Sequence, residues 1–413
     1  MSPLRESADF RRIWIGQMIS VLGRQIVTVA VPYQVYLMTH SSLAVGLLGV
    51  VQAIPIIAAG LYGGTLADRF DRRTVMIAGQ ILMAATSLVL VATALGRGGP
   101  LWVIYLATAV SAGAGTVIHS AQSALIPRLV GLRRLPVALA LNAGLFQITL
   151  VAGPALAGLI LAGLGLPAAY ALDVACFAAT VAVIWRLAPQ PPAAASSIGG
   201  WRAPIEGLRH VWKSQVLIGI FAVDLAAMVF GMPRALFPAL ATQVFQVGPS
   251  GLGLLYAAPG AGALIGAVFL GGVGRVRRQG LSVIWAVAAW GAAITLFGFS
   301  ERAFWLGLGC LAMAGLADMV SSIFRHTLLQ SEAPDELRGR LSAFNVMVIT
   351  AGPRLGDLES GAVAALSSIQ FAVVSGGLLS IAGAAAVAVL LPGLRRQRAP
   401  RSALELAQED GVV

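Results

Sequence analysis

Charged side chains are scarce in this chain. Only 11% of its 413 residues are Asp, Glu, Lys or Arg, against about 25% in a typical soluble domain. Hydrophobic residues make up 58%, and the mean hydropathy is +0.85. So few charges cannot cover the outside of a water-soluble globule, and the apolar surface must therefore face lipid. The composition excludes an ordinary soluble protein and predicts a membrane protein.

Lysine and cysteine are almost absent. Lys213 is the single lysine and no glycine directly precedes it, which excludes a phosphate-binding Walker loop. Cys176 and Cys310 both lie in apolar runs, so a disulfide framework is not expected. The chain also lacks His-Glu-x-x-His, Cys-x-x-Cys and Gly-x-Ser-x-Gly patterns. We therefore expect a protein that is not an enzyme and that needs no metal and no cofactor.

Long apolar segments follow one another along the whole chain. A transmembrane helix needs about 20 apolar residues, and segments of this length without strand alternation favour helices over a barrel. Twelve such segments lie near residues 13–37, 44–66, 74–95, 101–123, 137–162, 168–187, 214–238, 251–273, 281–299, 303–325, 342–366 and 369–391. The first is too long for the apolar region of a secretory signal. We predict an all-α membrane protein with twelve transmembrane helices.

The cations are distributed unevenly between the two sets of connections. One set, which includes both termini, holds 22 of the 28 Lys and Arg, and the opposite set holds only Arg97 and Arg302. Because cytoplasmic loops retain positive charge, we expect both termini in the cytoplasm of a bacterial inner membrane and an even number of spans. The chain has 28 Lys and Arg against 17 Asp and Glu, and this excess of cations would also suit nucleic-acid binding. The placement of the cations between apolar runs favours a membrane topology.

The two halves of the sequence resemble each other. Residues 152–156, Ala-Gly-Pro-Ala-Leu, recur in the eleventh segment as Ala-Gly-Pro-Arg-Leu at 351–355, and Gly63-Gly64 before three arginines is matched by Gly271-Gly272. Two six-helix bundles related by a parallel repeat place a transporter's central site between them. The predicted parts are an N-terminal bundle (1–187), a cytoplasmic linker rich in Pro, Ala and Ser (188–212), a C-terminal bundle (213–392) and a cytoplasmic tail (393–413).

Two motifs carry a resemblance to a known family. Residues 64–73, Gly-Thr-Leu-Ala-Asp-Arg-Phe-Asp-Arg-Arg, resemble the signature loop between spans two and three of the major facilitator superfamily. The pattern Gly153-Pro154 with Gly158 is similar to that superfamily's antiporter motif, which implies export in exchange for protons. The candidate residues of a cytoplasmic gate are Gly64, Asp68, Arg69, Asp71, Arg72 and Arg73.

Four further segments, 38–42, 237–241, 253–258 and 327–330, resemble the enterobactin exporter branch of the superfamily. This resemblance implies a proton-driven inner-membrane exporter of a siderophore, with exporters of macrolides and other drugs as related members. The sequence departs from the superfamily in span four, where residues 111–115 carry no arginine. That part of the superfamily's proton-coupling scheme therefore does not transfer to this chain.

Asp68 lies beside the three arginines of the loop and has two interpretations. As a latch, assisted by Asp71, it binds an opposing cation or helix N-terminus when the cytoplasmic side closes, a contact of about 0.3 to 1 kcal/mol that biases two states. As a structural residue, it lies in a solvated turn that caps the third helix. The resemblance favours the latch.

Charges inside the predicted spans are the strongest functional signal from the residues themselves. A charged side chain at mid-bilayer costs about 2.5 to 3.5 kcal/mol and faces a cavity or a partner. The candidates for proton coupling are Arg24, Asp224, Asp318 and Arg325. In one hypothesis Asp224 or Asp318 accepts the proton and Arg24 exchanges partners. In the other, Arg24 pairs permanently with an Asp and only holds the halves together.

A second charged cluster interrupts the eleventh span. Arg354 and Asp357 are three residues apart and can pair on one helix face, whereas Glu359 points elsewhere. We favour structural pairing, with proton handling as the alternative.

The sequence therefore predicts a monomeric secondary transporter that exchanges a small molecule, most simply a siderophore, for protons across the lipid bilayer. Multidrug or macrolide efflux is the alternative within the same class. A membrane sensor or scaffold without transport is the alternative from another class, and the short predicted loops argue against it.

Overall fold

The computed structural model describes residues 3–96, 99–131, 133–190, 202–269, 276, 278–300, 303–334 and 337–397, and in these ranges all regular structure is helical. The helices of the first half are α1 (Pro3–Glu6), α2 (Ala8–Thr39), α3 (Ser42–Arg69), α4 (Arg72–Leu95), α5 (Leu101–Val130), α6 (Leu135–Gly163) and α7 (Gly165–Trp185). The second half holds α8 (Arg202–Val211), α9 (Gln215–Phe230), η1 (Arg234–Leu236), α10 (Phe237–Ala239), η2 (Leu240–Val244), α11 (Gly248–Phe269), α12 (Gln279–Gly298), α13 (Phe304–Glu332), α14 (Arg338–Leu366), α15 (Ile369–Leu390) and α16 (Pro392–Arg396).

Eleven helices in the described ranges are long and apolar enough to cross a membrane. One of them is the interrupted segment from α9 to η2, Gln215–Val244. The remaining long helix is α14, whose 29 residues include Arg354, Asp357 and Glu359 and are correspondingly more polar. The predicted all-α membrane fold is confirmed, and the twelve predicted spans correspond to these eleven helices together with α14.

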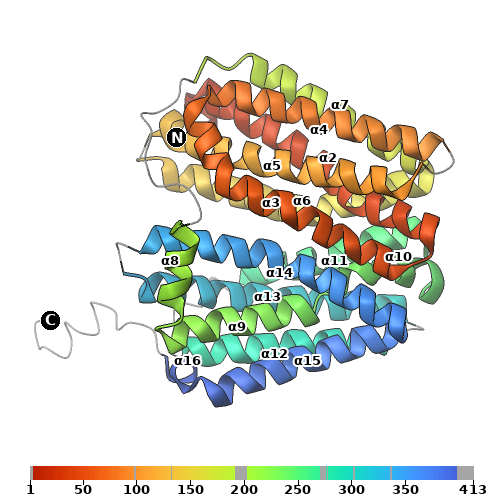
Figure 1. The fold of residues 1–413 in the computed structure, drawn as a ribbon, viewed down its shortest axis with the longest axis vertical. Coiled ribbons are helices and arrows are strands. Elements are labelled where there is room, and N and C mark those ends of the chain that lie inside the picture. Colours follow the sequence, from red (N-terminus) through yellow and green to blue (C-terminus); the bar gives the residue numbers. More distant parts are fainter. Residues whose placement is uncertain are drawn as a thin grey trace, which may run out of the picture.

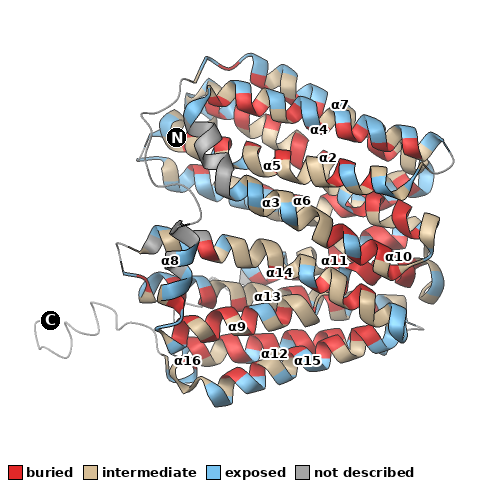
Figure 2. Cartoon of the chain, in the orientation of Figure 1, coloured by how far each residue is buried: buried red, intermediate tan, exposed pale blue. Residues whose placement is uncertain are grey.

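Helices α2 to α7 form one bundle and α9 to α15 form the other (Figure 1). In the first bundle α4 packs on α5 and α7, and α2 packs on α6 and α7. In the second, α12 packs on α13 and α15. Figure 2 shows buried residues inside the second bundle, along α9 and α12, and where the bundles meet near α10 and α11. Close packing of these buried side chains therefore holds the helices of each bundle together.

Parts of the sequence predictions fall outside the described residues. These parts are Arg97 and Arg302 of the cation-poor connections, residues 191–201 of the linker, 271–275 of the second arginine-rich turn and 398–413 of the tail. The domain boundaries at residues 187, 212 and 392 stay predictions.

The two bundles meet mainly through two helix pairs, α3 with α14 and α6 with α11, with smaller contacts of α3 with η1 and of α2 with α10 and α11. Glycines make these approaches close. A Cβ on Gly49 would lie 2.7 Å from the Arg354 carbonyl oxygen, and one on Gly361 would lie 2.6 Å from that of Ser42. In Figure 1 the bundles converge toward the end that carries α10. A Cβ on Gly60, later in α3, or on Gly144, early in α6, would meet nothing within 4 Å. Small residues let backbones approach in lipid, where packing rather than hydrophobicity drives helix association.

Candidate functional site

The strongest charge cluster lies inside the C-terminal bundle, between α9 and α13. Arg325 Nη2 lies 2.9 Å from Asp224 Oδ1 and 3.6 Å from Asp318 Oδ1, and Arg325 Nη1 donates to the Ser321 hydroxyl at 2.8 Å. The side chains of Arg325 and Asp224 are 8% and 4% exposed, whereas that of Asp318 is 46% exposed. The structure therefore brings together three of the four residues predicted for proton coupling, with one arginine shared by a buried and an accessible carboxylate.

Arg24 lies apart from this cluster, in the N-terminal bundle. No described carboxylate lies within 4 Å of its guanidinium, and the acid that acts on it electrostatically is Asp173 of α7. Arg24 therefore does not bridge the halves through Asp224 or Asp318 in this structure. The sequence analysis missed Asp173, although a lone acid in the apolar segment 168–187 was a usable signal.

The described part of the arginine-rich loop forms hydrogen bonds with the ends of several helices. Asp71 is the N-cap of α4 and accepts from the backbone N–H groups of Arg73 and Thr74, at 2.8 and 3.3 Å. Its second oxygen accepts from the Gln190 N–H at 2.9 Å. Arg72 Nη1 donates to the Ala124 carbonyl at 3.2 Å. This loop therefore holds the ends of α4 and α5 and the chain beyond α7 in one layer.

The remaining loop residues behave differently. Arg73 donates to the Trp185 carbonyl at 2.5 Å and lies 5.7 Å above its ring. Arg69 is exposed. The side chain of Asp68 and the surroundings of Gly64 lie outside the described residues, so the latch stays a prediction. For Asp71, capping of the third span is what the structure shows.

The antiporter-like motif lies at a crossing of three helices. A Cβ on Gly153 would collide with Gln25 of α2, and one on Gly158 would lie 2.8 Å from the Gly253 Cα of α11. Pro154 is buried, and its carbonyl faces Gly253. Gln25 Nε2 also donates to the Thr149 carbonyl at 3.4 Å. The motif therefore serves close packing of α6 on both α2 and α11, across the bundle boundary.

The same crossing recurs in the second half, but with charges. Gly352 packs on Met228 of α9, as Gly153 packs on α2, and the backbone at Asp357 packs on Gly46 of α3, as Gly158 packs on Gly253. The internal sequence repeat thus corresponds to equivalent helix contacts. Arg354 and Asp357 take the places of small residues of the first half.

Arg354 and Asp357 do not form the ion pair that their spacing suggested. Arg354 Nη1 donates to the Thr350 carbonyl one turn earlier, at 2.6 Å, and Asp357 Oδ1 is buried without a hydrogen-bond partner. Glu359 Oε2 is buried without a hydrogen-bond partner as well. The nearest features of Asp357 belong to η1, where Arg234 is the cation that acts on it most strongly.

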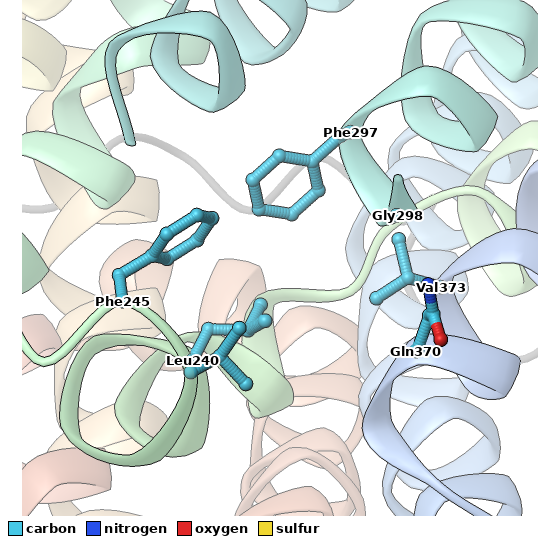
Figure 3. Close-up of a pocket in the computed structure, with 7 residues that line it drawn as sticks. Leu240, Phe245, Phe297, Gly298, Gln370 and Val373 are labelled. Atoms are coloured by element: carbon cyan, nitrogen blue, oxygen red, sulfur yellow. The ribbon is translucent and has the colours of Figure 1, made fainter. Parts of the chain in front are cut away.

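The described part of the chain holds no candidate metal cluster, and the enclosed cavity at the end of α12 is small. No cluster of three or more His, Cys, Asp or Glu side chains there could hold a metal ion. Figure 3 shows a cavity of about 10 Å³ lined by seven residues, including Phe245, Phe297 and Gln370. A single water needs about 10 to 15 Å³, so this space is too small for an organic substrate.

Comparison with known families decides the class of the protein. A family model described as transmembrane secretion effector, within the major facilitator superfamily, matches residues 1–410. The chain belongs to this family. The predicted resemblance to the superfamily is thereby confirmed, and the chain is a multi-pass membrane transporter.

The relatives and structural neighbours agree with this assignment. Enterobactin exporter EntS of Shigella boydii serotype 18 and EntS of Escherichia coli O1:K1 are each 30% identical over 400 residues, which cover 96% of this chain and 95% of the relative. The nucleoside transporter NupG has a TM-score of 0.75 at 14% identity, covering 92% of this chain and 99% of its own. An inward-facing bacterial homologue of the iron transporter ferroportin has a TM-score of 0.70 at 18% identity, covering 94% and 100%. The neighbours show the fold alone.

Proposed function

We propose that this transporter exports a small molecule of the siderophore type across the bacterial inner membrane in exchange for protons, by alternating access. The match to enterobactin exporters over 96% of the chain supports the substrate class and the direction. The Arg325 ion cluster supports the coupling. In this cluster one buried arginine is shared by two carboxylates from different helices.

The two carboxylates of this cluster suit different roles. Asp224 is buried at 2.9 Å from Arg325, and breaking such a buried pair leaves an uncompensated charge. Asp318 is half-exposed and lies at 3.6 Å, so water can reach it and its loss leaves Arg325 paired. We infer that Asp318 accepts the proton and that Asp224 holds Arg325 in place. Substrate and proton would then compete for the side chain nearest the accessible surface.

The contacts between the bundles suit an exporter that waits for its substrate from the cytoplasm. The bundles converge toward the end that carries α10 (Figure 1), and the cation-rich connections lie at the other end. With cations retained in the cytoplasm, the closed end is periplasmic and both termini are cytoplasmic. Rocking of the bundles about the α3–α14 and α6–α11 contacts would then open the periplasmic side.

Transport by everted inner-membrane vesicles tests the proposal. Vesicles with an acidic interior should accumulate a labelled catecholate siderophore, and accumulation should stop when nigericin collapses the proton gradient. Asp318→Asn should abolish gradient-driven uptake, while the surface control Asp9→Asn should not. Uptake that persists without the gradient would reject proton coupling. Uptake of a macrolide but not of the siderophore would favour drug efflux, and uptake of neither would favour a sensor.

Cysteine labelling tests the orientation. In a Cys176→Ser, Cys310→Ser background, Arg133→Cys and Ala303→Cys place single thiols at exposed positions at opposite ends of the spans. A membrane-impermeant maleimide should label Ala303→Cys in spheroplasts and Arg133→Cys only in everted vesicles. The reverse pattern would overturn the proposed topology.

A further inference from the structure

One face of α2 carries a row of polar side chains that meet polar side chains of the same bundle. The Gln122 amide of α5 donates to Gln17 Oε1 at 2.8 Å. The Gln80 amide of α4 donates to the Ser20 hydroxyl at 3.2 Å. Arg24 follows one turn later, and spacings of three and four residues keep Gln17, Ser20 and Arg24 on one face. A polar stripe therefore runs into the N-terminal bundle from its cytoplasmic end in the proposed orientation.

A cavity follows this stripe. Its volume is about 30 Å³, and its polar lining includes Gln17, Ser20, Arg24, Gln80, His119 and Gln122. A water molecule needs about 10 to 15 Å³ and two to four polar partners. The cavity meets both requirements, in contrast to the apolar pocket of Figure 3. The cavity can therefore hold water against the Arg24 guanidinium.

Asp173 is a buried acid near Arg24, and one of its carboxylate oxygens accepts no hydrogen bond. It is 1% exposed. Asp173 Oδ2 accepts from the Ser87 hydroxyl at 2.6 Å, whereas Oδ1 has no hydrogen-bond partner. Gly23 makes room for Oδ1, because a Cβ there would lie 2.5 Å from it. A buried carboxylate with one free oxygen and no salt bridge is costly, and such groups in spans commonly mark proton pathways.

The polar and titratable groups around Asp173 come from three helices. They are Arg24 of α2, Ser87 of α4, and Tyr170 and Cys176 of α7 itself. His119 of α5 lines the same cavity as Arg24. Arg24 is thus the single cation among them, and it attracts Asp173 without contacting it. A short movement of Arg24 would complete an ion pair, and its withdrawal would leave a site for a proton.

We propose that Asp173 is a second proton-binding site, buried in the N-terminal bundle, with Arg24, which lines the cavity, as its exchangeable counter-ion. Asp173 itself does not line the cavity, so proton release requires a movement of Arg24 that admits a cavity water. The proton then leaves the O–H of the neutral carboxyl for that water, and the carboxylate pairs with Arg24. The Asp173 site extends the proposed proton coupling and depends on that proposal only for the direction of proton flow. It does not depend on which substrate is carried.

Infrared difference spectroscopy tests the site without any substrate. Purified protein in lipid nanodiscs, titrated between acid and alkaline pH, should show the C=O stretching band of a protonated carboxyl group that Asp173→Asn removes. Ser87→Ala should shift the frequency of that band, because the hydroxyl hydrogen-bonds to the carboxyl. Asp318→Asn should retain the band. An unchanged spectrum for Asp173→Asn would overturn the proposal.

Transport then separates this inference from the proposed function. If Asp173 binds a coupling proton, Asp173→Asn should lose gradient-driven uptake but keep exchange of labelled for unlabelled substrate at equal pH, which needs no net proton movement. Loss of both with a normal elution profile would assign Asp173 a structural role and reject the proposal. If Asp173→Asn does not fold, Ser87→Ala decides, since an unshifted band would exclude Asp173. A titrating band in a protein that moves no siderophore would contradict only the proposed function.

Discussion

Gly158 of α6 and Gly253 of α11 meet so closely that a Cβ built on Gly253 would lie 2.7 Å from the Gly158 Cα and 2.5 Å from the Pro154 carbonyl oxygen. The contact joins the two bundles at a motif that the family resemblance associates with antiport. No other pair of residue types allows this approach, because any side chain would occupy the space of the opposite backbone. The packing requirement therefore explains the glycines without any direct chemical role.

Gly253→Ala should push α11 away from α6. Because the added methyl group meets backbone rather than a flexible side chain, we expect a loss of about 1 to 3 kcal/mol and a large loss of transport. Thermal unfolding in detergent and vesicle uptake measure the two effects. Gly144→Ala is the matched control, since a Cβ at Gly144 meets nothing within 4 Å. Equal behaviour of the two variants would contradict this interpretation of the contact.

Asp224→Asn and Asp318→Asn should separate stability from coupling. Removing the charge of buried Asp224 leaves Arg325 poorly compensated, at a cost of about 3 kcal/mol. Asp318 is half-exposed, so its replacement should cost only about 0 to 1 kcal/mol while abolishing gradient-driven transport. Unfolding midpoints of both variants and of Asp224→Asn with Arg325→Gln measure the coupling between the partners. A stable Asp224→Asn protein would mean that the pair is not structural.

Asp71→Ala should destabilise the start of α4. Loss of an N-cap costs about 0.5 to 2 kcal/mol, and the Gln190 contact is lost with it. Asp71→Ser keeps a capping oxygen without the charge, so it should recover most of the stability and of the transport rate. The unfolding midpoint and the rate of uptake provide the comparison. If Asp71→Ser is as inactive as Asp71→Ala, the charge itself takes part in gating.

Glu359→Gln should leave transport intact and raise the unfolding midpoint. The buried Oε2 of Glu359 has no hydrogen-bond partner, and burying a neutral amide costs far less than burying a carboxylate. Thermal unfolding and vesicle uptake measure both outcomes. A loss of gradient-driven uptake in this variant would instead assign Glu359 to proton handling, the alternative that its sequence position left open.

Much of the architecture could be predicted because it depends on local properties of the chain. Runs of about 20 apolar residues must be helices in lipid, and the repeat of Ala-Gly-Pro at 152–154 and 351–353 predicted two related halves. Gly153 of α6 packs against α2, and Gly352 of α14 packs against α9 in the corresponding position. The Arg325 cluster was also within reach, since Asp318 and Arg325 lie on one face of a single helix.

The other contacts between charged side chains could not be predicted from the sequence. Arg24 was expected near Asp224 or Asp318 and instead acts on Asp173, which the sequence analysis overlooked. Arg354 and Asp357 were expected to pair, and instead Arg354 donates to a backbone carbonyl and Asp357 faces Arg234 of η1. Sequence by itself determined the membrane class, the helical spans and the doubled plan, because hydrophobicity and repetition act along the chain. Tertiary structure alone decided which charges meet, because a partner depends on how helices distant in sequence are rotated about their axes. Successive side chains of a helix point about 100° apart. A small rotation of a packed helix therefore directs a charged side chain toward a different neighbour.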